Sequence, residues 1–163
     1  MKKTLFALFI LFIAGVACKK INNNGNTCAC SPARGPELYL SVKSSAGVDL
    51  LNSKNAGAYT KDQIQFYQKD GTGKVTQLTF YIREPFNYGD NKFANYSFYA
   101  PVSFLQGTTA NTVYLKLNGK EYKLNIQLAQ TKADVDQLQI DDKAATKDTG
   151  DLAKYVSMFY LTE

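Results

Sequence analysis

Hydrophobic and polar residues alternate along most of the chain from residue 36 onward. In the first such run, residues 37–43, Leu38, Leu40 and Val42 fall on one side. A period of two predicts a β-strand, because successive side chains of a strand point to opposite faces of its sheet. We therefore expect this strand to have one buried face and one solvent-facing face.

Further runs with the same period follow, separated by turn residues. They predict strands or hairpins at residues 63–68, 75–83, 96–105, 112–128, 134–142 and 155–161, with turns at 44–47, 69–74 and 147–151. In the second of these strands, Leu78, Phe80 and Ile82 are expected to face inward. Residues 83–95 break the period and are predicted to form the longest irregular segment. Pro101 cannot donate to a neighbouring strand, which predicts an edge position for its strand.

The clearest predicted element is a β-hairpin around Asn118-Gly119, a turn sequence typical of two-residue hairpin loops. This turn sets the register of the two strands. On the inner face it pairs Leu117 with Lys120, Leu115 with Tyr122 and Val113 with Leu124, and on the outer face Lys116 with Glu121 and Tyr114 with Lys123. We expect an ion pair in the first outer pair and a cation–π contact in the second, each contributing about 0.2–1 kcal/mol.

The amino-acid composition points in the same direction. The chain contains 11 Tyr and 10 Phe, residue types that favour the half-buried surface of a sheet. No amphipathic helix of ordinary length follows residue 18. About eight or nine short strands with frequent turns predict an all-β fold over residues 36–163, an antiparallel β-sandwich of immunoglobulin-like or similar type.

The first residues follow a different pattern. After Lys2 and Lys3, the chain is apolar and uncharged from Leu5 to Ala17, too short for the roughly 20 residues that span a bilayer. Such a segment is typical of a signal peptide. Together with the small residues before Cys18, residues 1–17 resemble a bacterial lipoprotein signal, which implies cleavage before Cys18 and lipid attachment to its thiol. The alternative is an ordinary secretory signal cut after Ala17, which would leave Cys18 as a free thiol.

Residues 18–35 are expected to form a lipid anchor and a flexible tether. Two or more acyl chains on Cys18, palmitate among them, would hold the protein stably on a membrane. The lysines at 19 and 20 would lie beside lipid headgroups, and the Asn-rich stretch after them has little to bury. Cys28 and Cys30 are the only other cysteines. They are interpreted as a bridged or structurally paired couple, with a redox pair or half of a metal site as the alternatives.

Several chemistries are excluded or lack support. The chain has no His, which excludes Ser-His and Cys-His nucleophile pairs. Its 19 basic and 14 acidic residues are spread along the chain, which argues against a nucleic-acid role. The acidic residues from Asp134 to Asp142 leave a calcium site as an alternative to a plain strand, although they lack the central Gly and terminal Glu of an EF-hand. We expect no enzymatic activity and no cofactor.

Aromatic residues supply the remaining candidate binding site. Phe86, Tyr88, Phe93 and Tyr99 lie in and after the irregular segment, and Tyr67, Tyr81 and Tyr114 are expected to point outward from strands. Aromatic rings of this kind stack on sugars. The alternative is that they are ordinary residues of a sheet surface. The two interpretations differ in whether the rings form one exposed, coplanar patch or point inward.

The part of the chain after the signal resembles a group of small Bacteroidota lipoproteins. The resemblance lies in "PELYLSVKSSAGVDLLN", "YTKDQIQFYQKDG" and "DVDQLQI". It implies an exported, membrane-anchored lipoprotein, expected in the outer membrane, with the periplasmic and surface faces both open. We expect a structural or interaction role with an envelope protein or glycan as partner. The alternative is a carbohydrate-binding module at the cell surface.

Overall fold

The structure, a computed structural model, describes residues 35–109, 111–129 and 134–163. These residues belong to one compact unit, Gly35–Glu163. The predicted signal peptide, the anchor at Cys18, the tether up to residue 34 and the pair Cys28 and Cys30 lie outside the described residues.

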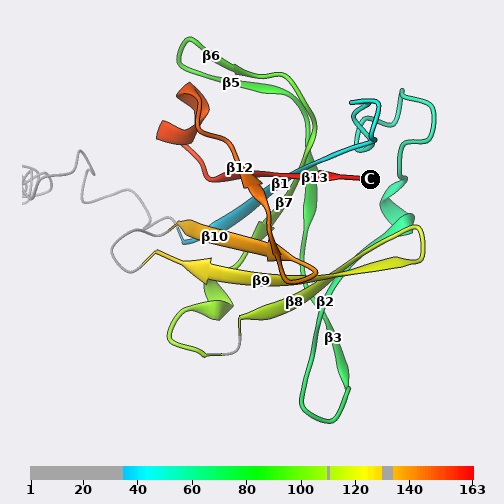
Figure 1. The fold of residues 1–163 in the computed structure, drawn as a ribbon, viewed down its shortest axis with the longest axis vertical. Helices are drawn as coiled ribbons and strands as arrows, with labels where there is room; N and C mark the ends of the chain where they lie inside the picture. Colours follow the sequence, from blue (N-terminus) through cyan, green and yellow to red (C-terminus); the bar gives the residue numbers. More distant parts are fainter. Residues whose placement is uncertain (1–34, 110, 130–133) are drawn as a thin grey trace, which may run out of the picture. The chain divides into compact units, whose positions relative to one another are not determined.

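Two β-sheets make up most of the domain (Figure 1). The five-stranded sheet contains, in spatial order, β12 (Thr146–Lys147), β13 (Met158–Thr162), β1 (Glu37–Lys43), β7 (Ser97–Pro101) and β4 (Tyr81–Arg83). The six-stranded sheet contains β11 (Lys143–Ala144), β10 (Val135–Ile140), β9 (Lys120–Leu128), β8 (Thr112–Leu117), β2 (Ile64–Lys69) and β3 (Val75–Gln77). This confirms the predicted all-β, sandwich-like fold.

The smaller elements are one hairpin and three single turns of 3-10 helix. The hairpin is formed by β5 (Phe86–Tyr88) and β6 (Asn91–Phe93), which are a two-stranded sheet of their own. The 3-10 turns are η1 (Lys61–Gln63), η2 (Ser103–Leu105) and η3 (Asp151–Lys154). Within the described residues, the structure has no helix long and apolar enough to cross a membrane.

One strand pairing differs from the all-antiparallel expectation. β1 and β13 are parallel, with Tyr39 opposite Met158 and Val42 opposite Leu161. A parallel pair needs a long connection between its strands, and here the rest of the domain supplies it, since these are the first and last strands.

The main core lies between the two sheets. Leu38, Phe98 and Phe159 of the five-stranded sheet belong to the same buried cluster as Phe66 and Leu124 of the six-stranded sheet. The rings of Phe66 and Phe98 meet edge to face, with centroids 5.2 Å apart. Fully burying one such side chain stabilises the fold by about 1.5–3 kcal/mol, so this core is the principal source of stability.

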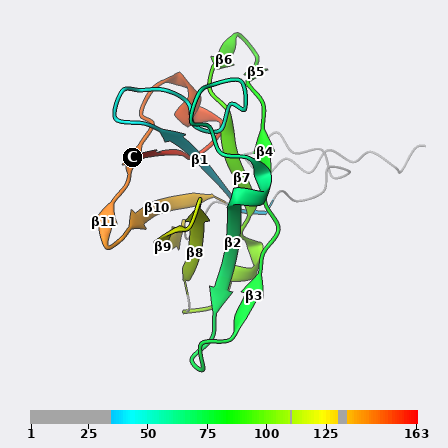
Figure 2. The same ribbon diagram turned by 90° about the vertical axis from the view of Figure 1, so that its right-hand side faces the viewer.

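Two chain segments cross from one sheet to the other, at opposite edges of the sandwich. The predicted strand 75–83 is in fact two strands, β3 in the six-stranded sheet and β4 in the five-stranded one (Figure 2). Between and within them, Leu78, Phe80 and Ile82 pack against the core, as predicted. On the other side, Ala145 packs against the core between β11 and β12. Short strands that bend across in this way leave little exposed edge for aggregation.

The hairpin predicted around Asn118-Gly119 is confirmed in its register. β8 and β9 pair Leu117 with Lys120, and all five predicted pairs occur. Asn118 and Gly119 both have positive φ, 44° and 90°, as a type I′ turn requires. Local turn chemistry and the hydrophobic period agree here, and that agreement made the prediction accurate.

The segment 83–95, predicted as irregular, contains the β5–β6 hairpin instead. Phe86 pairs with Phe93, and Tyr88 with Asn91, across a two-residue turn at Gly89-Asp90. Gly89 has a φ of 58°, which glycine adopts without strain. A Gly-Asp turn between two short runs is a hairpin signal, but each run has only three residues, too few to show a period.

The edge position predicted from Pro101 is also wrong. Its strand, β7, lies between β1 and β4. The Val102 N–H donates to the Pro36 carbonyl on the β1 side, so the neighbouring proline nitrogen faces the β4 side. Since β4 pairs only with Ser97–Tyr99, the missing N–H of Pro101 interrupts no pairing.

The outer face of β1 is buried, contrary to the expectation that it meets solvent. Tyr39 and Ser41 are each 1% exposed. Tyr39 belongs with Phe93, Val156 and Met158 to a second hydrophobic cluster. This cluster, here called the outer cluster, lies on the outer face of the five-stranded sheet. The β5–β6 hairpin contributes Phe93, and Val156 comes from the segment after η3, so these two segments form a partial third layer.

Candidate functional site

A row of three tyrosines crosses the outer face of the five-stranded sheet. The strand register places Tyr39 of β1 opposite Tyr99 of β7, and Tyr99 opposite Tyr81 of β4. Neighbouring ring centroids lie 5.1 Å and 5.8 Å apart. The exposed fraction rises from 1% at Tyr39 to 51% at Tyr81. We call these residues the tyrosine row, which runs from the buried outer cluster to the exposed edge of the sheet.

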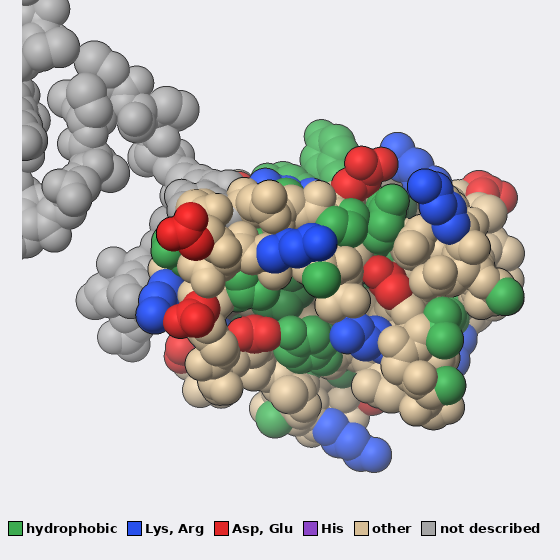
Figure 3. All heavy atoms as spheres, turned by 90° about the horizontal axis from the view of Figure 1, so that it is seen from above, with side chains coloured by type: hydrophobic (Ala, Val, Ile, Leu, Met, Phe, Trp, Pro, Cys, Tyr) green, Lys and Arg blue, Asp and Glu red, His purple; other side chains and the backbone are tan. Residues whose placement is uncertain are grey.

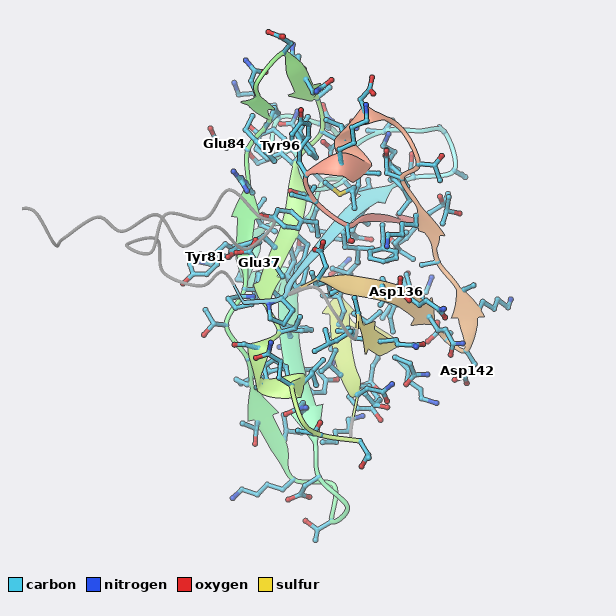
Figure 4. The ribbon with its side chains drawn as sticks, turned by 90° about the vertical axis from the view of Figure 1, so that its left-hand side faces the viewer. Glu37, Tyr81, Glu84, Tyr96, Asp136 and Asp142 are labelled. Carbon is cyan, nitrogen blue, oxygen red and sulfur yellow. The ribbon has the colours of Figure 1, made fainter. Side chains whose placement is uncertain are left out.

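A carboxylate and a guanidinium hold the inner part of the tyrosine row. The hydroxyls of Tyr39 and Tyr99 both donate to the Glu37 carboxylate, each at 3.0 Å. Arg83 Nη1 donates to the Tyr39 hydroxyl at 2.8 Å. Hydrogen bonds that involve a charged group are about twice as strong as neutral ones, so this network fixes the orientation of the rings. In Figure 4, Tyr81 extends away from the sheet on the side where Glu37 lies.

Arg83 also links the tyrosine row to the hairpin. Its guanidinium carbon lies 3.6 Å from the centroid of the Phe86 ring, a cation–π contact. Phe86 in turn stacks on Phe93, with centroids 4.1 Å apart and planes at 10°. The hairpin therefore positions the side chain that donates to Tyr39.

The structure brings together three of the four aromatic residues predicted as a binding platform. Phe86 contacts Phe93 directly, and Tyr99 packs against the same outer cluster. Phe93 is only 2% exposed, however, so these rings do not form one exposed, coplanar patch. The side chain of Tyr88 lies outside what the structure describes.

Glu37, Tyr39 and Arg83 are site residues that the sequence analysis missed. Their proximity depends on the pairing of β1, β7 and β4, strands that are far apart in the chain. The local signal around Glu37 and Tyr39 is that of an ordinary strand. The usable signals for this face were Tyr81, expected to point outward, and the aromatic residues of the predicted platform.

The outer face of the six-stranded sheet carries a separate polar network, which corrects two predicted contacts. Glu121 accepts hydrogen bonds from Lys69 at 2.8 Å and from the Tyr67 hydroxyl, and the Lys69 ammonium lies 4.2 Å from the Tyr114 ring centroid. Lys69 of β2 thus forms the ion pair with Glu121 that was expected of Lys116. It also forms the cation–π contact with Tyr114 that was expected of Lys123. The hairpin register was correct, but a third strand beside the hairpin supplies the cation.

This network shifts the pKa values of Tyr67 and Glu121 in opposite directions. Burial, followed by the hydrogen bond to Glu121, raises the pKa of Tyr67 to about 12. The hydrogen bond from Lys69, followed by that from Tyr67, lowers the pKa of Glu121. Tyr67 is buried rather than exposed as expected, and it stacks on Tyr114 with centroids 5.6 Å apart. Neither tyrosine presents a free face like that of Tyr81.

A third cluster connects the two sheets at one end of the sandwich. The Glu163 carboxylate accepts hydrogen bonds from the Tyr59 and Tyr122 hydroxyls, and Lys120 Nζ lies 3.8 Å from it. Burial raises the pKa of Glu163. Since Glu163 follows β13 and Tyr122 belongs to β9, this cluster joins the sheets and has a structural role.

The acidic residues weighed as a calcium site are spread out. Asp142 forms an ion pair with Lys123 at 2.9 Å, and Asp141 accepts a hydrogen bond from the Lys123 backbone N–H. Figure 4 shows Asp136 well apart from Asp142. Among the described residues, no three or more Asp, Glu or Cys side chains are grouped as metal ligands. The residues from Val135 to Ile140 form the strand β10, which is the second of the two alternatives.

The surface charge and the comparisons with known proteins add no further specificity. The end of the domain seen in Figure 3 carries acidic and basic side chains interspersed with hydrophobic ones. Comparison of the chain with protein-family models, with curated proteins and with solved structures finds no match.

Proposed function

We propose that this protein is a lipid-anchored, non-enzymatic protein of the cell envelope, held in the outer membrane through Cys18. We further propose that its domain binds an envelope partner through the tyrosine row at the β4 edge. The exposure of Tyr81, at the end of an otherwise fixed row of rings, carries this second proposal. A large aromatic side chain on a rigid support is typical of interaction surfaces.

Three observations support binding rather than catalysis. The chain has no His, the commonest general base. The Glu37 carboxylate accepts hydrogen bonds from two tyrosines, which occupies it structurally. Hydrogen bonds with Glu37 and Arg83 fix the inner rings of the tyrosine row before any partner binds. The row therefore loses little conformational entropy on binding.

A protein partner fits the site better than a glycan does. A sugar platform needs several exposed rings in one plane, whereas Phe93 is buried and Phe86 is half-buried between Phe93 and Arg83. Tyr81 lies instead on an edge strand of three residues, where backbone groups lie next to its side chain. Edge strands with an exposed side chain are suited to recognition of another polypeptide.

The anchor is tested by metabolic labelling with an alkyne analogue of palmitate. The wild-type chain is expected to incorporate label and to partition into detergent, and Cys18→Ser is expected to do neither. Label that persists in Cys18→Ser would contradict the anchor.

The binding surface is tested by site-specific photocrosslinking in cells. A photoreactive phenylalanine analogue replaces Tyr81 in one strain. In the control strain it replaces Val75, which is 47% exposed at the edge of the six-stranded sheet. We expect a discrete crosslinked protein band at position 81 and none at position 75. Equal crosslinking at both positions would contradict a specific surface. A parallel thermal-shift panel of envelope glycans distinguishes the carbohydrate-binding alternative.

A further inference from the structure

A second row of side chains lies beside the tyrosine row on the same outer face. The register of β4 and β7 places Arg83 opposite Ser97. The register of β7 and β1 pairs Leu40 with Phe98, so Ser41 falls opposite Ser97. Directly opposed side chains in an antiparallel pair have Cβ atoms about 4.5–5.5 Å apart. Arg83, Ser97 and Ser41 therefore occupy neighbouring positions on three adjacent strands.

The two hydroxyls are buried without a hydrogen-bond partner. Ser41 and Ser97 are each 1% exposed. Within the described part of the chain, neither Oγ has a partner. Most buried side-chain hydroxyls in proteins are hydrogen-bonded, because an unpaired buried polar group destabilises the fold. Two such groups on adjacent strands are unusual and call for a specific explanation.

Arg83 brings a positive charge to the same row. It is half-buried, and its contacts are the Phe86 ring and the ring and hydroxyl of Tyr39, and that hydroxyl in turn donates to the Glu37 carboxylate. Among the ion pairs that the structure places between described residues, none involves Arg83. A guanidinium has five N–H donors in a planar fork that matches the two oxygens of an oxyanion, and only one of them is used on Tyr39.

We propose that Arg83, Ser97 and Ser41 form a binding site for an oxyanion, the carboxylate, phosphate or sulfate group of a ligand. The guanidinium supplies the charge and a two-pronged hydrogen bond, and the two hydroxyls donate to the remaining oxygens. This site shares Arg83 with the tyrosine row, but it rests on a different observation, the two unpaired buried hydroxyls. Its ligand is recognised by its charged group, whereas Tyr81 offers an aromatic face.

Access to the site depends on the β5–β6 hairpin. The hairpin continues from β4 and leads into β7, and it packs on the outer face through Phe93. It is a separate two-stranded sheet, without a strand pairing to the five-stranded sheet. Among the described residues, side-chain contacts hold it down, including the packing of Phe93 and a hydrogen bond from Asn91 to the Tyr155 hydroxyl, so it can lift without breaking a β-ladder. Arg83 belongs to the β4–β7 ladder and would stay on the sheet, losing its contact with Phe86.

The test uses the full-length protein purified in detergent, with sulfate, inorganic phosphate and galacturonate as probes. Thermal unfolding and calorimetric titration are measured against chloride at equal ionic strength. We expect a saturable rise in Tm with at least one probe, and the probe that binds most tightly identifies the class of oxyanion. Arg83→Gln is expected to weaken that binding roughly 10- to 100-fold, the range for losing a hydrogen bond to a charged group.

The control is Lys116→Gln, which makes the same charge change at a half-buried position on the outer face of the six-stranded sheet. It should leave the affinity unchanged. A rise in Tm that is equal in wild type and Arg83→Gln is a general salt effect and would overturn the proposal. The absence of saturable binding with all three probes would do the same.

A second variant tests the hydroxyls separately from the guanidinium. Because Ser41→Ala with Ser97→Ala removes two unpaired buried groups, it should raise Tm in chloride by a few degrees and abolish the response to the oxyanion. If the two serines only bond to one another, the double variant would instead lower Tm. A lowered Tm with an unchanged oxyanion response would contradict the assignment.

Discussion

The outer faces of the two sheets differ in how far they are covered. On the six-stranded sheet the outer face is open, and its charges are paired along the surface, as in the ion pairs of Lys69 with Glu121 and Lys123 with Asp142. On the five-stranded sheet the outer face is largely covered by the β5–β6 hairpin and the η3 segment, which bury a second hydrophobic cluster there.

The difference is visible in the burial of single strands. In β10, exposed and buried residues alternate from Gln137 to Ile140, whereas in β1 five consecutive residues are buried. A strand covered on both faces gains stability from two layers, but its outer face then needs partners for every polar group. Glu37 and Arg83 supply partners for the tyrosine hydroxyls. The covered face therefore combines a rigid hydrophobic cluster with buried polar groups.

Phe93→Ala should give the largest effect, because it removes the main contribution of the hairpin to the outer cluster. The expected loss in the free energy of unfolding is about 3–5 kcal/mol, the usual range for a buried Phe. Urea unfolding monitored by circular dichroism measures it. The matched variant on the open face, Tyr114→Ala, should cost about 1 kcal/mol, since it loses a cross-strand pair. Equal losses would show that the outer cluster is not a second core.

Two tyrosines, one on each outer face, have raised pKa values. Burial, followed by the hydrogen bond to Asp148, raises the pKa of Tyr160 to about 12 on the covered face, and that of Tyr67 is also about 12 on the open face. A raised pKa means that the folded protein keeps its proton longer, so the stabilisation is present below pH 10 and is lost as pH rises towards 12.

The covering layer buries Tyr160, whereas neighbours on its own sheet bury Tyr67. In Phe93→Ala, we therefore expect the pKa of Tyr160 to fall towards 10 and that of Tyr67 to stay. Absorbance at alkaline pH follows the ionisation of both tyrosines. The variants Tyr160→Phe and Tyr67→Phe assign each titration step to its residue. A fall in both pKa values would show that the covering layer does not act on Tyr160 alone.

Glu121→Gln should have a smaller effect, because its ion pair with Lys69 is exposed. Such pairs contribute up to about 1 kcal/mol. The pKa of Glu121 is lowered, so its stabilisation is present at neutral pH and is lost as pH falls through that lowered pKa. Denaturation measured from pH 7 to pH 3 should show that the free energy of unfolding falls less with decreasing pH in the variant than in the wild type. A steeper fall of the free energy of unfolding in the variant would contradict this assignment.

Tyr81→Ala should have the smallest effect on stability, within about 0.5 kcal/mol, as expected for an exposed side chain outside the core. Its effect should fall on partner binding instead, seen as the loss of co-purification after crosslinking in cells. Val75→Ala on the other sheet should change neither property. Loss of several kcal/mol in Tyr81→Ala would show that the ring is part of the core.

Local sequence patterns predicted the fold where period and turn agreed. The β8–β9 hairpin was correct pair by pair, because Asn118-Gly119 fixes the register without help from distant residues. The β5–β6 hairpin was missed because strands of three residues show no period. Pro101 was placed at an edge because the sequence does not show where β4 ends.

The candidate site was predictable only in part. Tyr99, Phe86 and Tyr81 could be singled out because they are aromatic residues in or beside the segment that breaks the period. Glu37 and Arg83 do not, because their role arises from the pairing of β1, β7 and β4 across more than 40 positions of the chain. The burial of Phe93 depends on a third layer, which alternation within one strand cannot reveal.

The central claim is that the β4 edge of the five-stranded sheet is the binding side of the domain. Hydrogen exchange of the full-length protein, compared between native outer-membrane vesicles and detergent solution, tests it most directly. We predict slower exchange in the vesicles for peptides covering β4 and the tyrosine row, with no change for β3 at the edge of the other sheet. Slowing at β3 with unchanged exchange at β4 would contradict the account.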